Sequence, residues 1–203
     1  MKHQVDALTF WNQGKHREAA TSYWLSFRAI PNPTYETRYH IFHGYTSILR
    51  DNYFEASDDD VKNLEQIFRD KHEPRLFRLE AGFTLGVISY ARSERLKCQE
   101  YYHHAITIGE KSPKNSKQER LEQKKMMITP ETQKTMKELQ DGVLKICRDN
   151  LNGLNRSTRE QGMRGVAASH AQDVETAASL SNTFQVCLYH LLHHLQRKLI
   201  KWA

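Results

Sequence analysis

The feature that most constrains the fold is a succession of short helical stretches in the first 109 residues. Six such stretches, of eleven to seventeen residues, are joined by short turns, and no part of the chain shows the alternating pattern of a strand. The breaks fall at residues that stop helices, such as Gly14, Pro31, Pro33 and Pro74. The predicted helices cover residues 3–13, 16–29, 34–49, 57–73, 75–91 and 94–108. The sequence therefore predicts an all-α fold built as a short array of antiparallel helical hairpins, an α-α superhelix.

The stretch AGFTLGVISYARSERLKCQEYYHHAITI, residues 81–108, places small and aromatic residues at fixed offsets. Counted from Gly86, Cys98 lies twelve residues later, Tyr102 sixteen and Ala105 nineteen. Small residues allow two helix backbones to approach closely, and an aromatic ring fills the space that remains between them. We therefore expect Gly86 and Ala105 to lie at a tight contact between two paired helices.

The N-terminal stretch WNQGKHREAATSYWLSFRAIPNP shows the same order of residue types independently. Its corresponding positions are held by Ala7, by Gly14 at the turn, and by Ala19, Tyr23, Ser26 and the terminating Pro31. Both stretches resemble the tetratricopeptide repeat, and the resemblance extends over about residues 1–109. The third unit departs from the family pattern at its turn, where Ser93 stands in place of the common glycine.

A degenerate unit lies between these two stretches. Gly44 occupies the small position and Ala56 follows twelve residues later, but the helix behind it starts only at Ser57. Ala19 and Cys98 are 79 residues apart, whereas two repeats of about 34 residues would separate them by about 68. We therefore expect a lengthened turn in the second unit. The alternative is that amphipathic hairpins match a loose motif without being repeats.

The resemblance implies a concave groove, lined by the first helix of each hairpin, that binds a peptide or a helix. The positions expected in this groove are Leu8, Trp11, Asn12, Arg38, Ile41, Tyr45, Glu80, Phe83, Val87 and Tyr90. Their apolar character predicts an apolar anchor in the ligand. An equally open alternative is that these residues pack against another part of the same chain.

The remainder of the chain divides into three parts. Residues 110–154 are predicted to form an additional charged helical pair, whose second helix starts at Thr129 and Pro130 and stops at Gly153. Residues 155–180 have the composition of a flexible linker. Residues 181–203 are predicted to form an amphipathic helix with an apolar stripe from Phe184 to Trp202, which caps the array, fills the groove or contacts a membrane surface.

Charge favours acidic partners without identifying one. The net charge is +6 and the sequence pI is about 9.2, with basic runs between Lys111 and Lys125 and between Arg197 and Lys201. A basic protein associated with nucleic acid is the alternative function, but acidic residues interrupt the first run and no aromatic platform is interleaved there. The three cysteines do not form a C-x-x-C pair, and the N-terminus lacks a signal-peptide pattern. We expect an intracellular, cytoplasmic protein with buried reduced cysteines, and the nucleus is the alternative compartment.

Catalytic and metal-binding motifs are absent from the sequence. There is no G-x-S-x-G, P-loop, G-x-G-x-x-G or H-E-x-x-H pattern, and the acidic run 57–60 is explained by helix capping. His190 and His194 are spaced for one helix face, but solvated histidines are the expected interpretation. The sequence thus predicts a non-enzymatic adaptor or scaffold that binds an unidentified protein or peptide. No cofactor, metal or small-molecule substrate is expected.

Overall fold

The computed structural model describes residues 2–31, 34–110 and 130–164. These residues form seven α-helices and one short 3-10 helix and contain no strand, which confirms the predicted all-α fold. The elements are α1 (Lys2–Asn12), α2 (His16–Ala29), α3 (Tyr35–Asp51), η1 (Tyr53–Glu55), α4 (Asp58–Arg69), α5 (Arg75–Ala91), α6 (Arg95–Glu110) and α8 (Pro130–Arg164). Among the residues described, no helix has the length and apolar content needed to cross a membrane.

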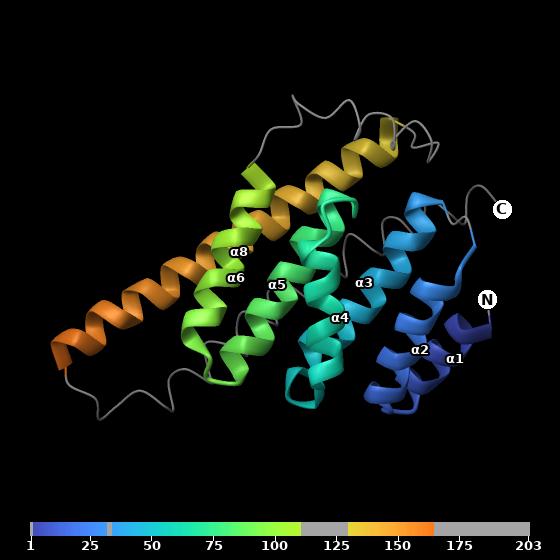
Figure 1. The fold of residues 1–203 in the computed structure, drawn as a ribbon, viewed down its shortest axis with the longest axis horizontal. Helices are drawn as coiled ribbons and strands as arrows, with labels where there is room; N and C mark the ends of the chain where they lie inside the picture. Colours follow the sequence, from blue (N-terminus) through green and yellow to red (C-terminus); the bar gives the residue numbers. More distant parts are fainter. Residues whose placement is uncertain (1, 32–33, 111–129, 165–203) are drawn as a thin grey trace. The chain divides into compact units, whose positions relative to one another are not determined.

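Met1–Asn155 forms one compact unit, and its first six helices follow one another as three hairpins. Figure 1 shows the turns within the hairpins, α1–α2, α3–α4 and α5–α6, at the lower end of the array. α3 packs on α2 and on α5, and α4 packs on α5. α5 and α6 make the most extensive helix pair, so the third hairpin is the closest packed of the three.

The turns of the first and third hairpins have the same backbone structure. Gly14 has φ +71° and Ser93 has φ +60°, both in the left-handed region. In each turn the residue that follows donates its N–H to the carbonyl five residues earlier, at 2.9 Å from Lys15 to Phe10 and at 2.8 Å from Glu94 to Ser89. The left-handed residue itself donates to the carbonyl three residues earlier in both turns. These paired bonds are the Schellman motif, which ends a helix by satisfying its last carbonyl groups.

The second hairpin turns differently. α3 ends at Asp51, its C-cap residue Asn52 has φ −125°, and the short helix η1 follows before α4 begins. The predicted lengthening of this turn is therefore confirmed. α4 starts with a capping box, because Asp60 donates its N–H to Ser57 Oγ at 3.2 Å and Ser57 donates its N–H to Asp60 Oδ2 at 2.9 Å. The acidic run thus has the capping role that its sequence predicts.

Glycines mark the closest helix contacts. A Cβ on Gly86 would overlap the ring of Tyr102, and a Cβ on Gly44 would lie 2.7 Å from the ring of Tyr23. Ala105 is fully buried and lies against Gly82. The expected tight contact at Gly86 and Ala105 is therefore present between α5 and α6. Gly44, in contrast, receives the aromatic ring of the preceding hairpin rather than of its own.

The interior is rich in aromatic rings. Phe27 of α2, Phe42 of α3 and Phe77 of α5 lie within 6.1 Å of one another, measured between ring centroids. Arg38 covers this group, with its guanidinium 4.7 Å from the Phe27 ring, and pairs with Glu73 at 2.7 Å. α3 and α5 are buried on nearly all sides, so they are the central helices of the unit.

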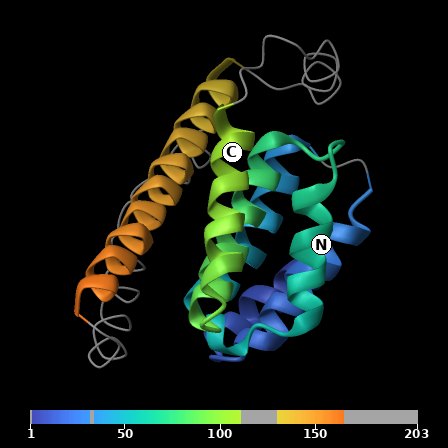
Figure 2. The ribbon, with the colours of Figure 1, turned by 60° about the vertical axis from the view of Figure 1, so that its left-hand side comes forward.

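α8 lies alongside α6 (Figure 2). Asn150 donates to the Tyr102 hydroxyl at 3.1 Å, Arg148 pairs with Glu110, and the backbone of Gly109 lies against the side chain of Leu144. Met136 and Leu139 also pack on the core.

The predicted end of this helix at Gly153 is wrong, because α8 continues to Arg164 and includes the first ten residues assigned to the linker, 155–164. A single glycine costs a helix about 1 kcal/mol relative to alanine, which does not stop it when Leu151 and Leu154 are buried on either side. The first helix of the expected charged pair, before Thr129, lies outside the described residues, as do the linker beyond 164 and the C-terminal helix at 181–203.

Candidate functional site: the polar cluster between α3 and α5

The predicted groove residues of α1 are exposed. Leu8 exposes 53% of its surface and Trp11 36%, and Asn12 beside them is also exposed. Val87 and Tyr90 of α5 are half-buried. These five residues remain accessible to a partner.

The predicted groove residues of the central helices are different. Ile41, Tyr45, Glu80 and Phe83 are all buried, so the accessible groove is wrong for them and the alternative, packing within the same chain, holds. The Tyr45 ring lies 5.3 Å from the Trp24 ring of α2, tilted by 36°, and its hydroxyl donates to Asp60 of α4 at 2.9 Å, so Tyr45 faces the second helices of the first two hairpins. The register predicted for α3 is therefore wrong. Gly44 fits against Tyr23 of α2 instead of its own hairpin, and this contact fixes a different rotation of α3.

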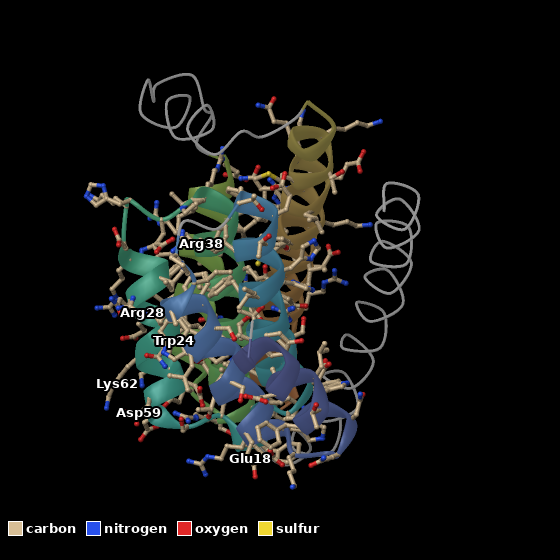
Figure 3. All side chains as sticks on the ribbon, turned by 90° about the vertical axis from the view of Figure 1, so that its right-hand side faces the viewer. Glu18, Trp24, Arg28, Arg38, Asp59 and Lys62 are labelled. Atoms are coloured by element: carbon tan, nitrogen blue, oxygen red, sulfur yellow. The ribbon has the colours of Figure 1, made fainter. Side chains whose placement is uncertain are left out.

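Arg38 is partly exposed, but its side chain already interacts with other residues of the array. Its side chain has the ion pair with Glu73 and covers two aromatic rings, so it packs in the array rather than rimming an open groove. Figure 3 shows Arg38, together with Trp24 and Arg28 of α2 and with Asp59 and Lys62 of α4. Arg28 lies over the Trp24 ring at 5.9 Å and Lys62 pairs with Asp59 at 3.0 Å. The Lys62–Asp59 pair is exposed and contributes little to stability.

The structure brings six polar residues together between the two central helices. We call them the α3–α5 cluster: His43, Thr46, Ser47, Arg50, Glu80 and Thr84. Four come from α3 with spacings of three, one and three residues, so they lie on one face of that helix. All except Ser47 are buried.

Glu80 is the centre of the cluster. Its Oε1 accepts from the Thr46 hydroxyl at 2.6 Å and from Arg50 Nη1 at 3.3 Å, and lies 2.5 Å from His43 Nδ1. Burial alone would raise the pKa of Glu80, but His43, Arg50 and the Thr46 hydroxyl outweigh it and lower the pKa to about 2. The carboxylate is therefore ionised at every physiological pH.

The hydrogen-bond directions in the cluster follow from the charges. Because Glu80 is ionised, it only accepts, and His43 Nδ1 must carry the proton between them. Arg50 has no acceptor, so its Nη2 donates to Ser47 Oγ at 3.0 Å and its Nη1 donates to Thr84 Oγ1 at 2.9 Å. Ser47 Oγ lies 3.2 Å from His43 Nε2, and in the neutral imidazole with its proton on Nδ1 this nitrogen accepts the Ser47 hydroxyl proton. The result is a chain from hydroxyl to imidazole to carboxylate.

Aromatic rings enclose the cluster. The Tyr39 ring stacks on His43 at 5.6 Å, and the Arg50 guanidinium lies over the Phe83 ring at 5.4 Å. Burial and the neighbouring Glu80 raise the pKa of Tyr39, so its phenol stays neutral. The charged pair of Arg50 and Glu80 thus lies in a low-dielectric environment, where the attraction between the two side chains is stronger than at a surface.

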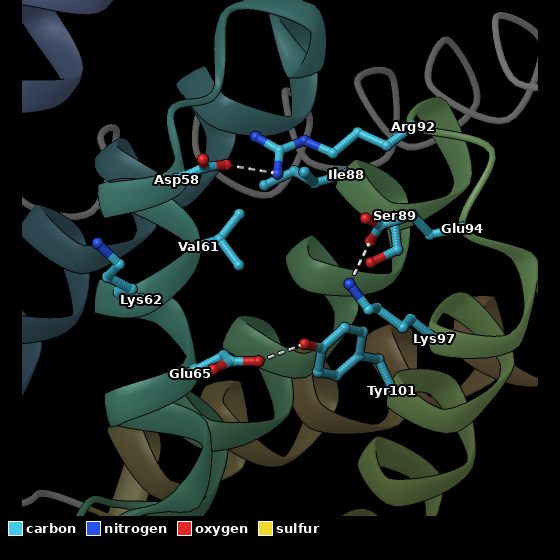
Figure 4. Close-up of a pocket in the computed structure, with 10 residues that line it drawn as sticks. All are labelled: Asp58, Val61, Lys62, Glu65, Ile88, Ser89, Arg92, Glu94, Lys97 and Tyr101. Carbon is cyan, nitrogen blue, oxygen red and sulfur yellow. Dashed lines mark hydrogen bonds and ion pairs between the residues drawn. The ribbon is translucent and has the colours of Figure 1, made fainter.

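A second concave feature opens between α4, α5 and α6, with a volume of about 320 Å³ (Figure 4). Its walls are Val61 and Ile88, with polar and charged side chains around them: Asp58, Lys62, Glu65, Ser89, Arg92, Glu94, Lys97 and Tyr101. The charges are compensated within the pocket, since Arg92 pairs with Asp58 and Lys97 pairs with Glu94. The Tyr101 hydroxyl donates to Glu65 at 2.5 Å. This pocket therefore presents no uncompensated charge to a ligand.

The cysteines of the described residues are buried and not joined in a disulfide. Burial raises the pKa of both the Cys98 and the Cys147 thiols to about 12, so they remain protonated and unreactive. The prediction of buried small side chains is confirmed for these two, and Cys187 lies outside the described residues. No group of three or more histidine, cysteine or acidic side chains within the described parts of the chain is placed to hold a metal ion.

Sequence reasoning missed the α3–α5 cluster except for Glu80, which it assigned to the groove rim. The available signal was the polar face of His43, Thr46, Ser47 and Arg50 on an otherwise apolar helix. Comparisons of the chain with protein-family models, with curated proteins and with solved structures found no match.

Proposed function

We propose that this chain is a protein–protein interaction scaffold, built on a tetratricopeptide-like array of helical hairpins. The observation that carries the proposal is that large apolar side chains are exposed at the turn end of every hairpin. Trp11 belongs to the first, Phe54, which exposes 72% of its surface, to the second and Leu96, which exposes 81%, to the third. Exposed apolar side chains that recur along one edge favour contact with a second macromolecule.

The first hairpin offers the best-defined part of this surface. Leu8 and Trp11 are three residues apart on α1, so their side chains are neighbours on one face of the helix. A stacked array also leaves its first hairpin without a neighbour on one side. An apolar anchor from a peptide or helix fits such a face, and aromatic residues contribute disproportionately to binding energy at protein interfaces.

The test is affinity capture with the full chain and with the double variant Leu8→Ser, Trp11→Ser. We expect the proteins captured by the wild type to fall at least about tenfold with the double variant, because loss of about 1.4 kcal/mol of binding energy has this effect. Leu25→Ser is the matched control, because Leu25 is an exposed apolar residue on α2 rather than on α1. Captured partners are then titrated individually by calorimetry.

Nuclease treatment separates the two classes of function. Partners that survive the nuclease and depend on Leu8 and Trp11 support the scaffold. Recovery of RNA or DNA, with protein partners lost after nuclease treatment, would instead favour the nucleic-acid alternative. Equal capture by the wild type and the double variant would place the interface elsewhere.

A further inference from the structure

We infer that the α3–α5 cluster is a nucleophilic site in which Ser47 is acylated by small carboxylic esters with His43 as its general base. The inference rests on the hydrogen-bond chain Ser47 Oγ, His43 Nε2, His43 Nδ1 and Glu80 Oε1, whose two links measure 3.2 and 2.5 Å. A hydroxyl, an imidazole and a carboxylate in this order are recognised as a nucleophilic site by geometry rather than by sequence position.

The tautomer of His43 is the one that a general base needs. In the neutral imidazole, the ionised Glu80 fixes the proton on Nδ1, and Nε2 is then the acceptor for the Ser47 proton. Thr46 and Arg50 hold Glu80 in turn, so the carboxylate cannot rotate away from the imidazole. Glu80 is thus a positioning residue, and Ser47 and His43 are the groups that touch the reacting atoms.

Arg50 supplies positive charge where the reaction would develop negative charge. Its Nη2 lies 3.0 Å from Ser47 Oγ, and its Nη1 is fixed by Thr84 and Glu80. A preorganised donor beside a forming oxyanion contributes about 100-fold to 1000-fold in rate. One charged donor, in place of a pair of backbone amides, suits reactive esters rather than amides.

The rotation of α3 leaves Ser47 as the half-buried member of the α3–α5 cluster. Tyr45 faces α4, and Ser47 lies two residues later, about 200° around the helix, on the opposite side. From Tyr39 onwards, the α3 residues that are not fully buried are His40, Gly44, Ser47 and Asp51, at steps of four, three and four. Ser47 therefore lies on the less buried side of this part of α3, although Gly44 on the same side is covered by the Tyr23 ring.

The chemistry balances within the site. Ser47 Oγ forms a bond to the ester carbonyl carbon while its proton moves to His43 Nε2, and the carbonyl oxygen becomes negative beside Arg50. The carbon–oxygen bond to the alcohol then breaks, and His43 returns the proton to the leaving oxygen. Water attacks the acyl-serine by the same route, which releases the carboxylic acid and restores the serine hydroxyl.

The test uses a fluorophosphonate probe on the full chain, followed by peptide mass spectrometry. Ser47 Oγ displaces fluoride from phosphorus, so we expect one adduct per chain, located at Ser47. Ser47→Ala should remove it, and His43→Gln should slow labelling at least about 100-fold, the lower range for a general base. Ser89→Ala is the matched control, because Ser89 is a buried serine on α5, and it should label like the wild type.

A second measurement separates a reacting serine from a structural one. Wild-type protein mixed with p-nitrophenyl acetate should release one equivalent of nitrophenol in a burst, and Ser47→Ala should lose the burst. The chain has eleven histidines that react slowly with this ester, so only the difference between the two proteins counts. A wild-type chain that stays unlabelled, a label on other residues, or a burst unchanged in Ser47→Ala would each overturn the inference. None of these readouts depends on capture of a protein partner.

Discussion

Lys15 and Glu94 donate the same backbone hydrogen bond at the turns of the first and third hairpins, and their turns are 79 residues apart. Ala19 and Cys98, each fully buried, follow at the same separation. The second hairpin has neither feature, because η1 lengthens its turn. The first and third hairpins thus share the same turn structure, and the second hairpin, which lies between them in the chain, has a different turn.

The difference shows two ways of fixing a helix in an array. In the third hairpin a glycine, Gly86, admits the ring of Tyr102 from its own partner helix. In the second hairpin, α3 is held by contacts with the neighbouring hairpins. Tyr23 of the preceding hairpin packs against it, and Arg50 and His43 make ionic hydrogen bonds to Glu80 on α5. Small-residue packing therefore operates both within the third hairpin, at Gly86, and between the first two, at Gly44, whereas the polar cluster connects only the second and third hairpins.

We expect the largest effect from a substitution that breaks the polar connection between α3 and α5. Glu80→Gln leaves the Arg50 charge buried without its counter-charge, and removing one partner of a buried pair is strongly destabilising. A pKa near 2, against an ordinary value of 4.5, corresponds to about 3 kcal/mol of stability at pH 7. We expect chemical denaturation to show a loss of about that size.

The same variant has a signature in acid. A carboxylate whose pKa is lowered by folding stabilises the protein above its unfolded pKa, near 4.5, and this contribution is lost as the pH falls towards 2. The wild type should therefore lose stability across that window more steeply than Glu80→Gln. Parallel pH profiles for the two proteins would show that Glu80 is not held as an ion.

We expect a smaller effect from alanine substitutions at the two glycine contacts. Gly86→Ala and Gly44→Ala each place a methyl group against an aromatic ring, and overpacking of this kind costs about 1–3 kcal/mol. Gly142→Ala in α8 is the control, because its Cβ meets nothing within 4 Å. That variant should gain about 0.5 to 1 kcal/mol from helix propensity. Thermal denaturation of the three variants tests whether the two contacts are tight. Equal melting temperatures for all three would refute the tight contacts.

We expect the smallest effect from substitutions of the left-handed residues in the turns of the first and third hairpins. Ser93 adopts φ +60°, which costs a side chain with a Cβ about 1–2 kcal/mol, so Ser93→Gly should stabilise the chain by about 0.5 to 1 kcal/mol. Gly14→Ala, at φ +71°, should destabilise it by a similar amount. Opposite signs in urea denaturation would establish that the two turns are equivalent. Destabilisation by Ser93→Gly would show that they are not.

Local features were predictable from the sequence. Helix periodicity, the terminating prolines, the cap at Ser57 and the small residues at Gly86 and Ala105 depend on neighbours close in the chain or on one hairpin. The lengthened second turn followed from counting residues between two matching hairpins. The end of α8 was predicted wrongly because a glycine such as Gly153 is a typical helix-ending signal. Buried leucines on both sides of Gly153 stabilise the helix through it.

The candidate site was not predictable in the same way. Its two halves, on α3 and α5, are 30 or more residues apart in the chain, and they meet only when α3 has its observed rotation. Repeat spacing set that rotation wrongly and turned Ile41 and Tyr45 towards a groove. The polar face that includes His43 and Ser47 was visible in the sequence, but its partner Glu80 was needed to give it chemical meaning.

The aromatic packing of the first hairpin has a spectroscopic consequence. Trp11 and Trp24 both belong to it, and the third tryptophan, Trp202, lies outside the described residues. Trp24 stacks on Phe27 and contacts Tyr45 of α3, so its indole emission follows the contact between the first two hairpins. Circular dichroism instead averages over every helix. The gap between the unfolding midpoints of these two signals is therefore a direct measure of how far cooperativity spreads along the array.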